Sequence, residues 1–564
     1  MWYASRMIRK ACVLLATAGW LACGGGAKPT ARAPAAAETA RGAAAPQPAL
    51  PRPAPLIAPI AADAPPDLLG VAVVPNARQA LADVVRAGRG IRGEPPPLDD
   101  SALGVGFGAM FGAGPVEGVD YDQPIWLLFV DPRTTDAPIV ALVGVADAAA
   151  LRRWADGAGV TADARGRVAV VGAPGAVAAT GDYAVRVLAA RKPPAHVTVT
   201  VSVDRLRARY PAEIDGFILA MKRATLRAPS QNESVSGNVG VDVIEACVRQ
   251  ADAASLSFEV GAGDLTVAFE IRGAPGSTMA KIASAQRPSD FAILDVFDVT
   301  GAAAFVAGDV QMGPLADAYA EIFSRLLPAL GADPEADSLW KQLASQSAGP
   351  TALRLDLSPM RMLTAYAVRD GAQALRLHRA FAAAAGWGAG GVRTEPIATP
   401  AFTYRDVPVD AYKLSLSQDE AATAAIAPQI ARWYASATMT VAAVDGYLVG
   451  ITAPDAAARM RAEIDRLAAG TRGHGSKLAA VQAARERRES VVVWVDIGAI
   501  AGALRAGERS APIEMAFGVG FTESSWLVRF TMPFDSIAAM SSLDDGAAAG
   551  PPPPPPTDVT PPRD

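Results

Sequence analysis

The 564-residue chain has very few of the residue types that build metal centres and nucleophilic sites. It contains three cysteines and three histidines, and His196, His378 and His474 have no Cys, Asp or Glu at a ligand spacing such as HxxxH. The scarcity of histidine also leaves Ser-His-Asp catalysis without a convincing base, and the chain has no G-x-S-x-G motif. The sequence therefore predicts no metal, no cofactor and no enzymatic activity.

An excess of basic charge is also missing. The chain has 52 Lys and Arg against 57 Asp and Glu, which gives a formal net charge of -5. Nucleic-acid binding depends on clusters of Lys and Arg that face phosphates. The charge balance therefore argues against nucleic acid as a partner.

The N-terminus has the layout of a secretory signal. Three basic residues are followed by an apolar run, Ala11–Ala22, and then by Cys23 and three glycines. The run is too short to span a bilayer, which needs about 20 apolar residues. We expect residues 1–22 to be a signal peptide that is removed, which lowers the net charge of the remaining chain to about -8 because the signal carries three basic and no acidic residues.

The end of this signal, Leu21-Ala22-Cys23-Gly24, resembles the lipobox of bacterial lipoproteins, although Trp20 stands where that motif usually has Leu. The resemblance implies that Cys23 is lipidated, for example with palmitate, and that the chain is cut just before it. It also implies a lipid-anchored protein of the cell envelope, at the outer membrane and facing the periplasm or the cell surface. Cys12 leaves with the signal, so Cys247 has no disulfide partner.

Two segments of low complexity flank the body of the chain. Residues 23–66 consist mainly of Ala, Pro and Gly, a composition that cannot bury enough apolar surface to fold, so they predict a disordered tether. Residues 544–564 contain six consecutive prolines, Pro551–Pro556. This Pro-rich tail is either a polyproline II segment or a solvated end without a role.

Between these segments, the same order of predicted strands and helices occurs twice. The matched strands are 69–74 and 302–307, 125–130 and 352–357, 139–145 and 363–368, 166–172 and 446–452, and 197–203 and 491–495; a hairpin follows each set, at 255–271 and 515–530. The second copy also carries an extra strand, 407–416, and a helix from Glu420 to Tyr434. We therefore divide the body into two repeats, 67–288 and 289–543.

This order of elements resembles that of uncharacterised, duplicated bacterial envelope proteins, a resemblance in architecture that implies no activity. Many of the predicted strands expose one polar face, and amphipathic helices accompany them. We expect an α+β fold of two similar halves, each a mostly antiparallel sheet with helices packed on one side.

Several short motifs resemble known sites but have simpler structural interpretations. The Gly-rich run 104–114, with Phe107 and Phe111, predicts an apolar surface loop that either has no role or touches a membrane or ligand. The segment Thr471–Lys477 predicts a linker between helices, because its Lys follows Ser where a phosphate-binding loop has the reverse order. Ser338 and Lys341 match S-x-x-K without its companion motifs.

Two further residues, Asp204 and Asp496, follow predicted strands and are expected to be helix N-caps.

Two functions are favoured over a third, a hydrolase with an unfamiliar site. The first is a non-enzymatic, membrane-anchored envelope lipoprotein that binds a protein partner or supports an assembly. The second is a carrier of lipid or another apolar ligand, held in a cleft between the two halves that the alternating strands line together with Phe107, Phe111 and Trp126.

Overall fold

A computed structural model describes residues 50–56, 60, 63–96, 98–135, 137–225, 231–311, 333, 335–384, 392–416, 428–504 and 512–540. Cys23, the signal peptide, the Pro-rich tail and the helix predicted at 314–330 lie outside these residues. Most of the helix predicted at 420–434 also lies outside them.

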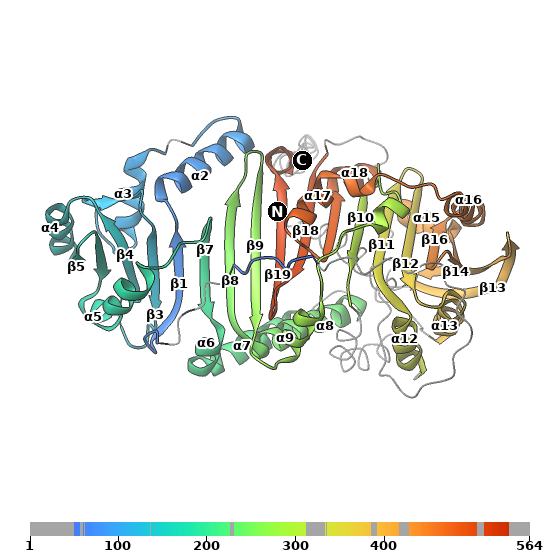
Figure 1. Ribbon diagram of the computed structural model, residues 1–564, viewed down its shortest axis with the longest axis horizontal. Helices are drawn as coiled ribbons and strands as arrows, with labels where there is room; N and C mark the ends of the chain where they lie inside the picture. The colour runs from blue at the N-terminus through green and yellow to red at the C-terminus, as the bar shows by residue number, and fades with distance from the viewer. Residues whose placement is uncertain are drawn as a thin grey trace, which may run out of the picture.

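The first half alternates strands and helices in the predicted order (Figure 1). Its elements are β1 (Leu68–Val74), α2 (Ala77–Arg92), α3 (Asp100–Ala109), β2 (Val119–Asp120), β3 (Ile125–Val130), β4 (Ile139–Val145), α4 (Ala148–Ala158), β5 (Thr161–Arg165), β6 (Val168–Gly172), α5 (Pro174–Tyr183), η1 (Ala184–Leu188), β7 (Val197–Ser202), α6 (Val203–Arg209), α7 (Pro211–Thr225), α8 (Gln231–Gln250), β8 (Ala251–Val260), β9 (Asp264–Gly273) and α9 (Thr278–Ala285).

The second half contains a matching strand for each principal strand of the first, together with the extra strand predicted at 407–416 and a neighbouring strand, 392–404, that was not predicted. Its elements are α10 (Ile293–Val296), β10 (Ala304–Asp309), α12 (Glu335–Ser345), β11 (Ser347–Leu357), β12 (Met360–Val368), α13 (Gly371–Ala384), β13 (Val392–Tyr404), β14 (Val407–Leu416), α15 (Pro428–Ser436), β15 (Thr438–Val444), β16 (Tyr447–Ala453), α16 (Ala456–Ala468), η2 (Gly475–Lys477), α17 (Ala479–Glu486), β17 (Val491–Asp496), α18 (Ile497–Leu504), β18 (Glu514–Phe521) and β19 (Ser525–Pro533).

All described strands join one antiparallel sheet, and the fold is α+β, as expected. In the first half the strands pair in the order β9-β8-β7-β1-β3-β4-β6-β5. In the second half the order is β19-β18-β17-β10-β11-β12-β16-β15, followed by β14 and β13. The two halves therefore share one order of strand pairing, while their origin by duplication stays a prediction.

The two halves meet where β9 pairs with β19 near the middle of the sheet, a junction that we call the seam (Figure 1). The pairing is antiparallel and continuous over nine residues, from Asp264 opposite Pro533 to Arg272 opposite Ser525. Backbone hydrogen bonds along this ladder satisfy groups that an isolated half would leave unpaired at its edge. The seam therefore joins the two halves into one sheet.

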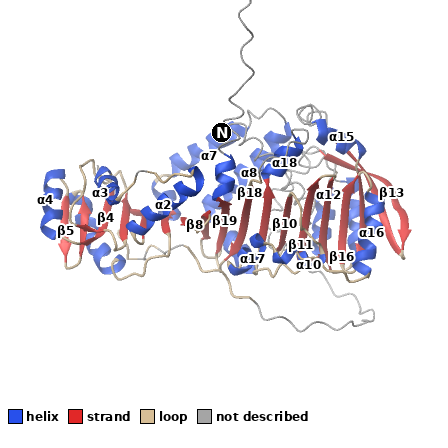
Figure 2. Ribbon diagram, turned by 90° about the horizontal axis from the view of Figure 1, so that it is seen from above, coloured by secondary structure: helices blue, strands red, loops and turns tan. Residues whose placement is uncertain are grey.

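The helices lie on both faces of the sheet, not on one side as expected (Figure 2). On β4, Val140 and Leu142 pack with α5, whereas Ala141 and Val143 pack with α4 on the other face. The second half shows the same division, with α16 and α13 on opposite faces. The physical reason is that several strands are apolar at every position, so both of their faces need cover.

The Gly-rich run 104–114 is also different from the prediction, because its first part forms the helix α3. Asp99 caps this helix by accepting a hydrogen bond from the backbone N–H of Ser101 at 3.0 Å. Gly108 permits close packing, since a Cβ there would lie 2.1 Å from the carbonyl oxygen of Gly114. Phe107 is consequently buried, so the prediction of a surface loop is wrong for this part.

The other local predictions have mixed outcomes. The segment Thr471–Lys477 does lie between two helices, α16 and α17. Asp496 caps α18, where its carboxylate accepts a hydrogen bond from the N–H of Ala499 at 3.0 Å. The N-cap prediction is wrong for Asp204, which lies inside the first turn of α6 and accepts a hydrogen bond from the Ser202 hydroxyl.

A buried carboxylate fixes the start of β1 to the turn between α6 and α7. Asp131 is 1% exposed, accepts hydrogen bonds from the Tyr210 hydroxyl and the Arg133 backbone N–H, and pairs with Arg209, which also pairs with Asp67 at 2.5 Å. The hydrogen bond from Tyr210 contributes most to a pKa of about 2 for Asp131.

Removing the Tyr210 hydroxyl tests this arrangement. Because the pKa of Asp131 is lowered on folding, its stabilising effect is complete above pH 4 to 5 and is lost as the pH falls towards 2. We expect Tyr210→Phe to lower the free energy of unfolding at pH 7, because Asp131 loses the hydrogen bond that contributes most to its low pKa. This difference should shrink between pH 4 and pH 2, as measured by urea denaturation.

The matched control is Tyr121→Phe. The Tyr121 hydroxyl is buried without a hydrogen-bond partner in the described structure, so its removal should cost nothing at either pH. Equal losses in the two variants would contradict the role given to Asp131.

Candidate binding surfaces at the seam

The two faces of the sheet differ sharply in chemistry at the seam. On one face, the side chains of β7, β8, β9 and β19 are mostly small or polar, and they are buried. Their hydroxyls pair across the strands: Thr198 donates to Ser257 at 3.2 Å, Thr200 bonds to Ser255, and Thr266 bonds to Thr531 at 2.9 Å. We call this side the strap face, because an N-terminal segment covers it.

This segment, residues 50–56, runs over the seam and contacts both halves. The guanidinium of Arg52 donates to the carbonyl oxygens of Ser284 at 2.6 Å and of Thr522, which belong to different halves. Further along, the backbone N–H of Leu56 donates to Glu270, a carboxylate on β9 that is fully buried. The last part of the predicted tether therefore belongs to the folded body, and we call it the strap.

Two further charged side chains close the strap face on the second half. Glu489 is 2% exposed and pairs with Arg529 at 3.1 Å. Burial raises the pKa of Glu489, while the positive charge of Arg529 opposes this shift. Since the charge is paired and covered, this cluster offers no charge to a ligand.

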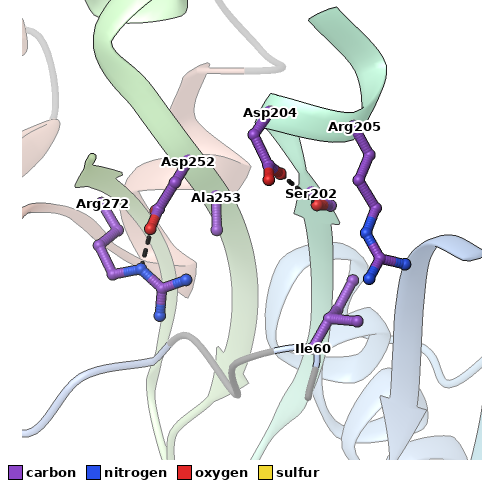
Figure 3. A pocket seen from close by; sticks show the side chains of 7 residues that line it. All are labelled: Ile60, Ser202, Asp204, Arg205, Asp252, Ala253 and Arg272. Carbon is purple, nitrogen blue, oxygen red and sulfur yellow. Dashed lines mark hydrogen bonds and ion pairs between the residues drawn. The ribbon is translucent and has the colours of Figure 1, made fainter. Parts of the chain in front are cut away.

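A pocket of about 290 Å³ opens beside the strap, at the end of β7, β8 and β9 (Figure 3). Its lining is mainly polar and consists of Ile60, Ser202, Asp204, Arg205, Asp252, Ala253 and Arg272.

Each charged group in this lining has a partner within the chain. Asp252 pairs with Arg272 at 2.8 Å, and Asp204 accepts from Ser202 (Figure 3). The guanidinium of Arg205 points to the carbonyl oxygens of Pro65 and Leu68, at 2.7 and 2.9 Å. The pocket is therefore a polar hollow at the end of these strands, with little unpaired charge for a ligand.

On the opposite face, which we call the open face, the same strands present apolar side chains that are incompletely covered. Two cross-strand rows run over the seam, Val197-Phe258-Val267-Phe530-Phe517 and Val199-Leu256-Phe269-Val528-Val519. None of these side chains is buried, and Phe258 and Phe269 are each 41% exposed. The usual arrangement of an apolar inner face and a polar outer face is thus reversed at the seam.

Described elements cover the open face only in part, at its second-half end, where Phe517 and Phe530 pack in one cluster with Ile537 and Met540. In Figure 2, α7, α8 and α18 lie on one side of the sheet, opposite α10, α16 and α17. At one end, α2 reaches Phe534, because a Cβ on Gly90 would lie 2.5 Å from that ring. Phe217 on α7 and Ile244 on α8 add exposed apolar side chains at 63% and 44%. The open face is therefore a bordered apolar surface.

A second buried cluster, on α13 and β14, has catalytic residue types but an unsuitable environment. Asp410 is fully buried and receives two hydrogen bonds from Arg379, at 2.8 and 3.1 Å. The Tyr412 hydroxyl lies 3.4 Å from both Asp410 and His378. Burial lowers the pKa of His378 to about 4 and raises that of Tyr412. At neutral pH the imidazole is uncharged and weakly basic, so the cluster acts as a structural network.

The other predicted motifs are not assembled into a site. Lys341 pairs with Asp337 on α12, so it does not activate Ser338. Cys247 is half-buried, and burial raises the pKa of its thiol. Within the described residues no group of three or more His, Cys, Asp or Glu is placed to hold a metal ion. A search of the same residues for a helix able to cross a membrane found none.

The aromatic residues expected to line a cleft between the halves do not do so. Phe107 and Trp126 are 4% and 2% exposed, and they belong to core clusters on opposite faces of the sheet. The residues that are exposed at the junction, including Phe258 and Phe269, lie in the predicted hairpins. The alternation of apolar and polar residues in those hairpins shows that each strand has an apolar side. Such a side is normally buried, so the pattern alone does not predict that it is exposed here.

Comparisons with known proteins give no family. No family model matches the chain, and no curated protein matches it. Among solved structures, crystal form IV of TP0453 is similar with a TM-score of 0.24 and 10% identity, over 44% of this chain and 96% of that one. Crystal form III of TP0453 has a TM-score of 0.22 and 10% identity, over 46% and 99%. Similarity this low says nothing about function.

A substitution of Arg52 tests whether this residue fixes the strap on the strap face. We expect Arg52→Ala to make the Leu56 amide, which donates to Glu270, exchange with deuterium about tenfold faster, because the strap loses the bonds from Arg52 to carbonyl oxygens of both halves. Arg152→Ala, on the exposed side of α4, is the matched control and should leave exchange unchanged. Unchanged exchange in both variants would mean that Arg52 does not fix the strap.

Proposed function

We propose that this chain is a non-enzymatic, lipid-anchored envelope protein that binds an apolar partner on the open face at the seam. The observation that supports this proposal most directly is the pair of apolar rows that no described element buries. Contiguous exposed apolar surface at the centre of a sheet is costly in water and is typical of interaction sites.

The anchor part of the proposal comes from Cys23 and the segment behind it. A lipidated Cys23, with a chain of 26 residues between it and Leu50, would hold the body near a membrane. The strap then transmits this attachment to the seam, because Arg52 and Leu56 contact the body beside the partner-binding strands.

Binding of a polypeptide surface is the function that the shape favours. The apolar side chains lie on an open sheet face bordered by helices, and Phe258 and Phe269 stand on neighbouring strands. Exposed aromatic side chains of this kind are common anchors in protein interfaces. A carrier of lipid or another apolar ligand is the second candidate, supported by the position of the same rows between the two halves.

Charged substitutions on the open face test the binding site. We expect the double variant Phe269→Glu and Val528→Glu to lose most of its binding of an apolar fluorescent probe, bis-ANS, since a carboxylate now stands in each place. The control is Ile397→Glu on β13, where an exposed apolar residue is changed far from the seam. Equal probe binding by all three proteins would contradict the proposed site, and lipid extracted with the unaltered protein would favour the carrier.

Lipidation has a direct test. In bacteria fed an alkyne analogue of palmitate, we expect the label to attach to the chain and to be lost in Cys23→Ser. Cys247→Ser, which changes a half-buried cysteine of the body, should keep the label. Label retained in Cys23→Ser would exclude this residue as the anchor.

A further inference from the structure

The open face needs an occupant in the absence of a partner. Its rows expose Phe258, Phe269 and Val528 at 41%, 41% and 36%. Apolar surface left in water is unfavourable roughly in proportion to its area. A segment that covers part of this surface reversibly would lower that cost and still give way to a tighter partner.

The described chain ends beside this surface. After β19, Phe534 donates its backbone N–H to the Gly263 carbonyl oxygen, at the turn of the β8–β9 hairpin. Ile537 and Met540 then pack in the core cluster that also contains Phe517 and Phe530. These two phenylalanines belong to the first apolar row of the open face, so the C-terminal tail starts at the rim of that row.

We propose that the polyproline run Pro551–Pro556 docks on the open face of its own chain, along the row Val197-Phe258-Val267-Phe530-Phe517. This inference rests on the proposed function, because it names an internal competitor for the same surface. The occupant is the tail itself, whose sequence follows residue 540 directly.

The lengths agree with this assignment. The ten residues 541–550 can span up to about 33 Å when extended, which is enough to reach any point of the row from its rim. Six residues of polyproline II measure about 19 Å. Five neighbouring strands, from β18 to β7, also span about 19 Å at a spacing near 4.8 Å.

The chemistry agrees as well. Polyproline II has a preformed backbone, so it loses little entropy on binding, and its rings pack on grooves lined with aromatic side chains. The row supplies three phenylalanine rings on three different strands, and Phe517 and Phe530 already lie in contact with centroids 5.0 Å apart. Attachment to the same chain gives the tail an effective concentration near the millimolar range, so weak affinity suffices.

The test uses full-length protein with benzoylphenylalanine in place of Phe258. Irradiation should join this position to a peptide that contains residues 551–556 of the same molecule. The control places the same group at Phe217 on α7, which is more exposed but lies outside the row, and should give no such link. Links from Phe258 to a second copy, or to no part of the tail, would overturn the inference.

A second variant does not alter the folded body. Replacing Pro551–Pro556 by alternating Gly and Ser should raise bis-ANS binding about threefold, because the surface loses its cover. Unchanged probe binding after this replacement would overturn tail docking. The proposed function fails on a different result, which is probe binding that survives Phe269→Glu together with Val528→Glu.

Discussion

The antiparallel pairing of β9 with β19 is the constraint on which the rest of the structure depends. It joins two halves of the same strand order into one sheet and fixes the direction of every side chain near the junction. Since side chains alternate along a strand, a shift of one residue would exchange the faces. The register that is present sends Glu270 and Leu527 to the strap face, and Phe269 and Val528 to the open face.

The two faces have opposite energetics. On the strap face, polar groups are buried and find partners: hydroxyls bond across strands, and Glu489 pairs with Arg529. Covering this face requires the strap, which brings the chain from the predicted membrane anchor directly onto the seam. On the open face, apolar side chains remain in contact with water. The seam therefore has one polar face that is covered and one apolar face that is incompletely covered. That contrast is the physical basis of the proposed binding role.

Much of the fold could be predicted from the sequence, because strand length, alternation and turn residues are local properties. The structure has strands at both predicted hairpins, 255–271 and 515–530, and at the matched positions before them. Helices on both faces were missed, although runs such as Ile139–Val145 are apolar at every position and indicate two covered faces. The candidate surface was missed because a sequence shows which side of a strand is apolar, not which side is covered. Only the folded chain reveals that the strap covers the polar side.

Cysteine scanning across the seam measures this reversed burial directly. In a background of Cys247→Ala, single cysteines at Phe269 and Val528 should react rapidly with a water-soluble maleimide, because their side chains face water. Cysteines at the neighbouring Ala268 and Leu527, which are 5% and 0% exposed, should be protected. The opposite pattern, with 268 and 527 reactive and 269 and 528 protected, would contradict the account, since the apolar face would then be the buried one.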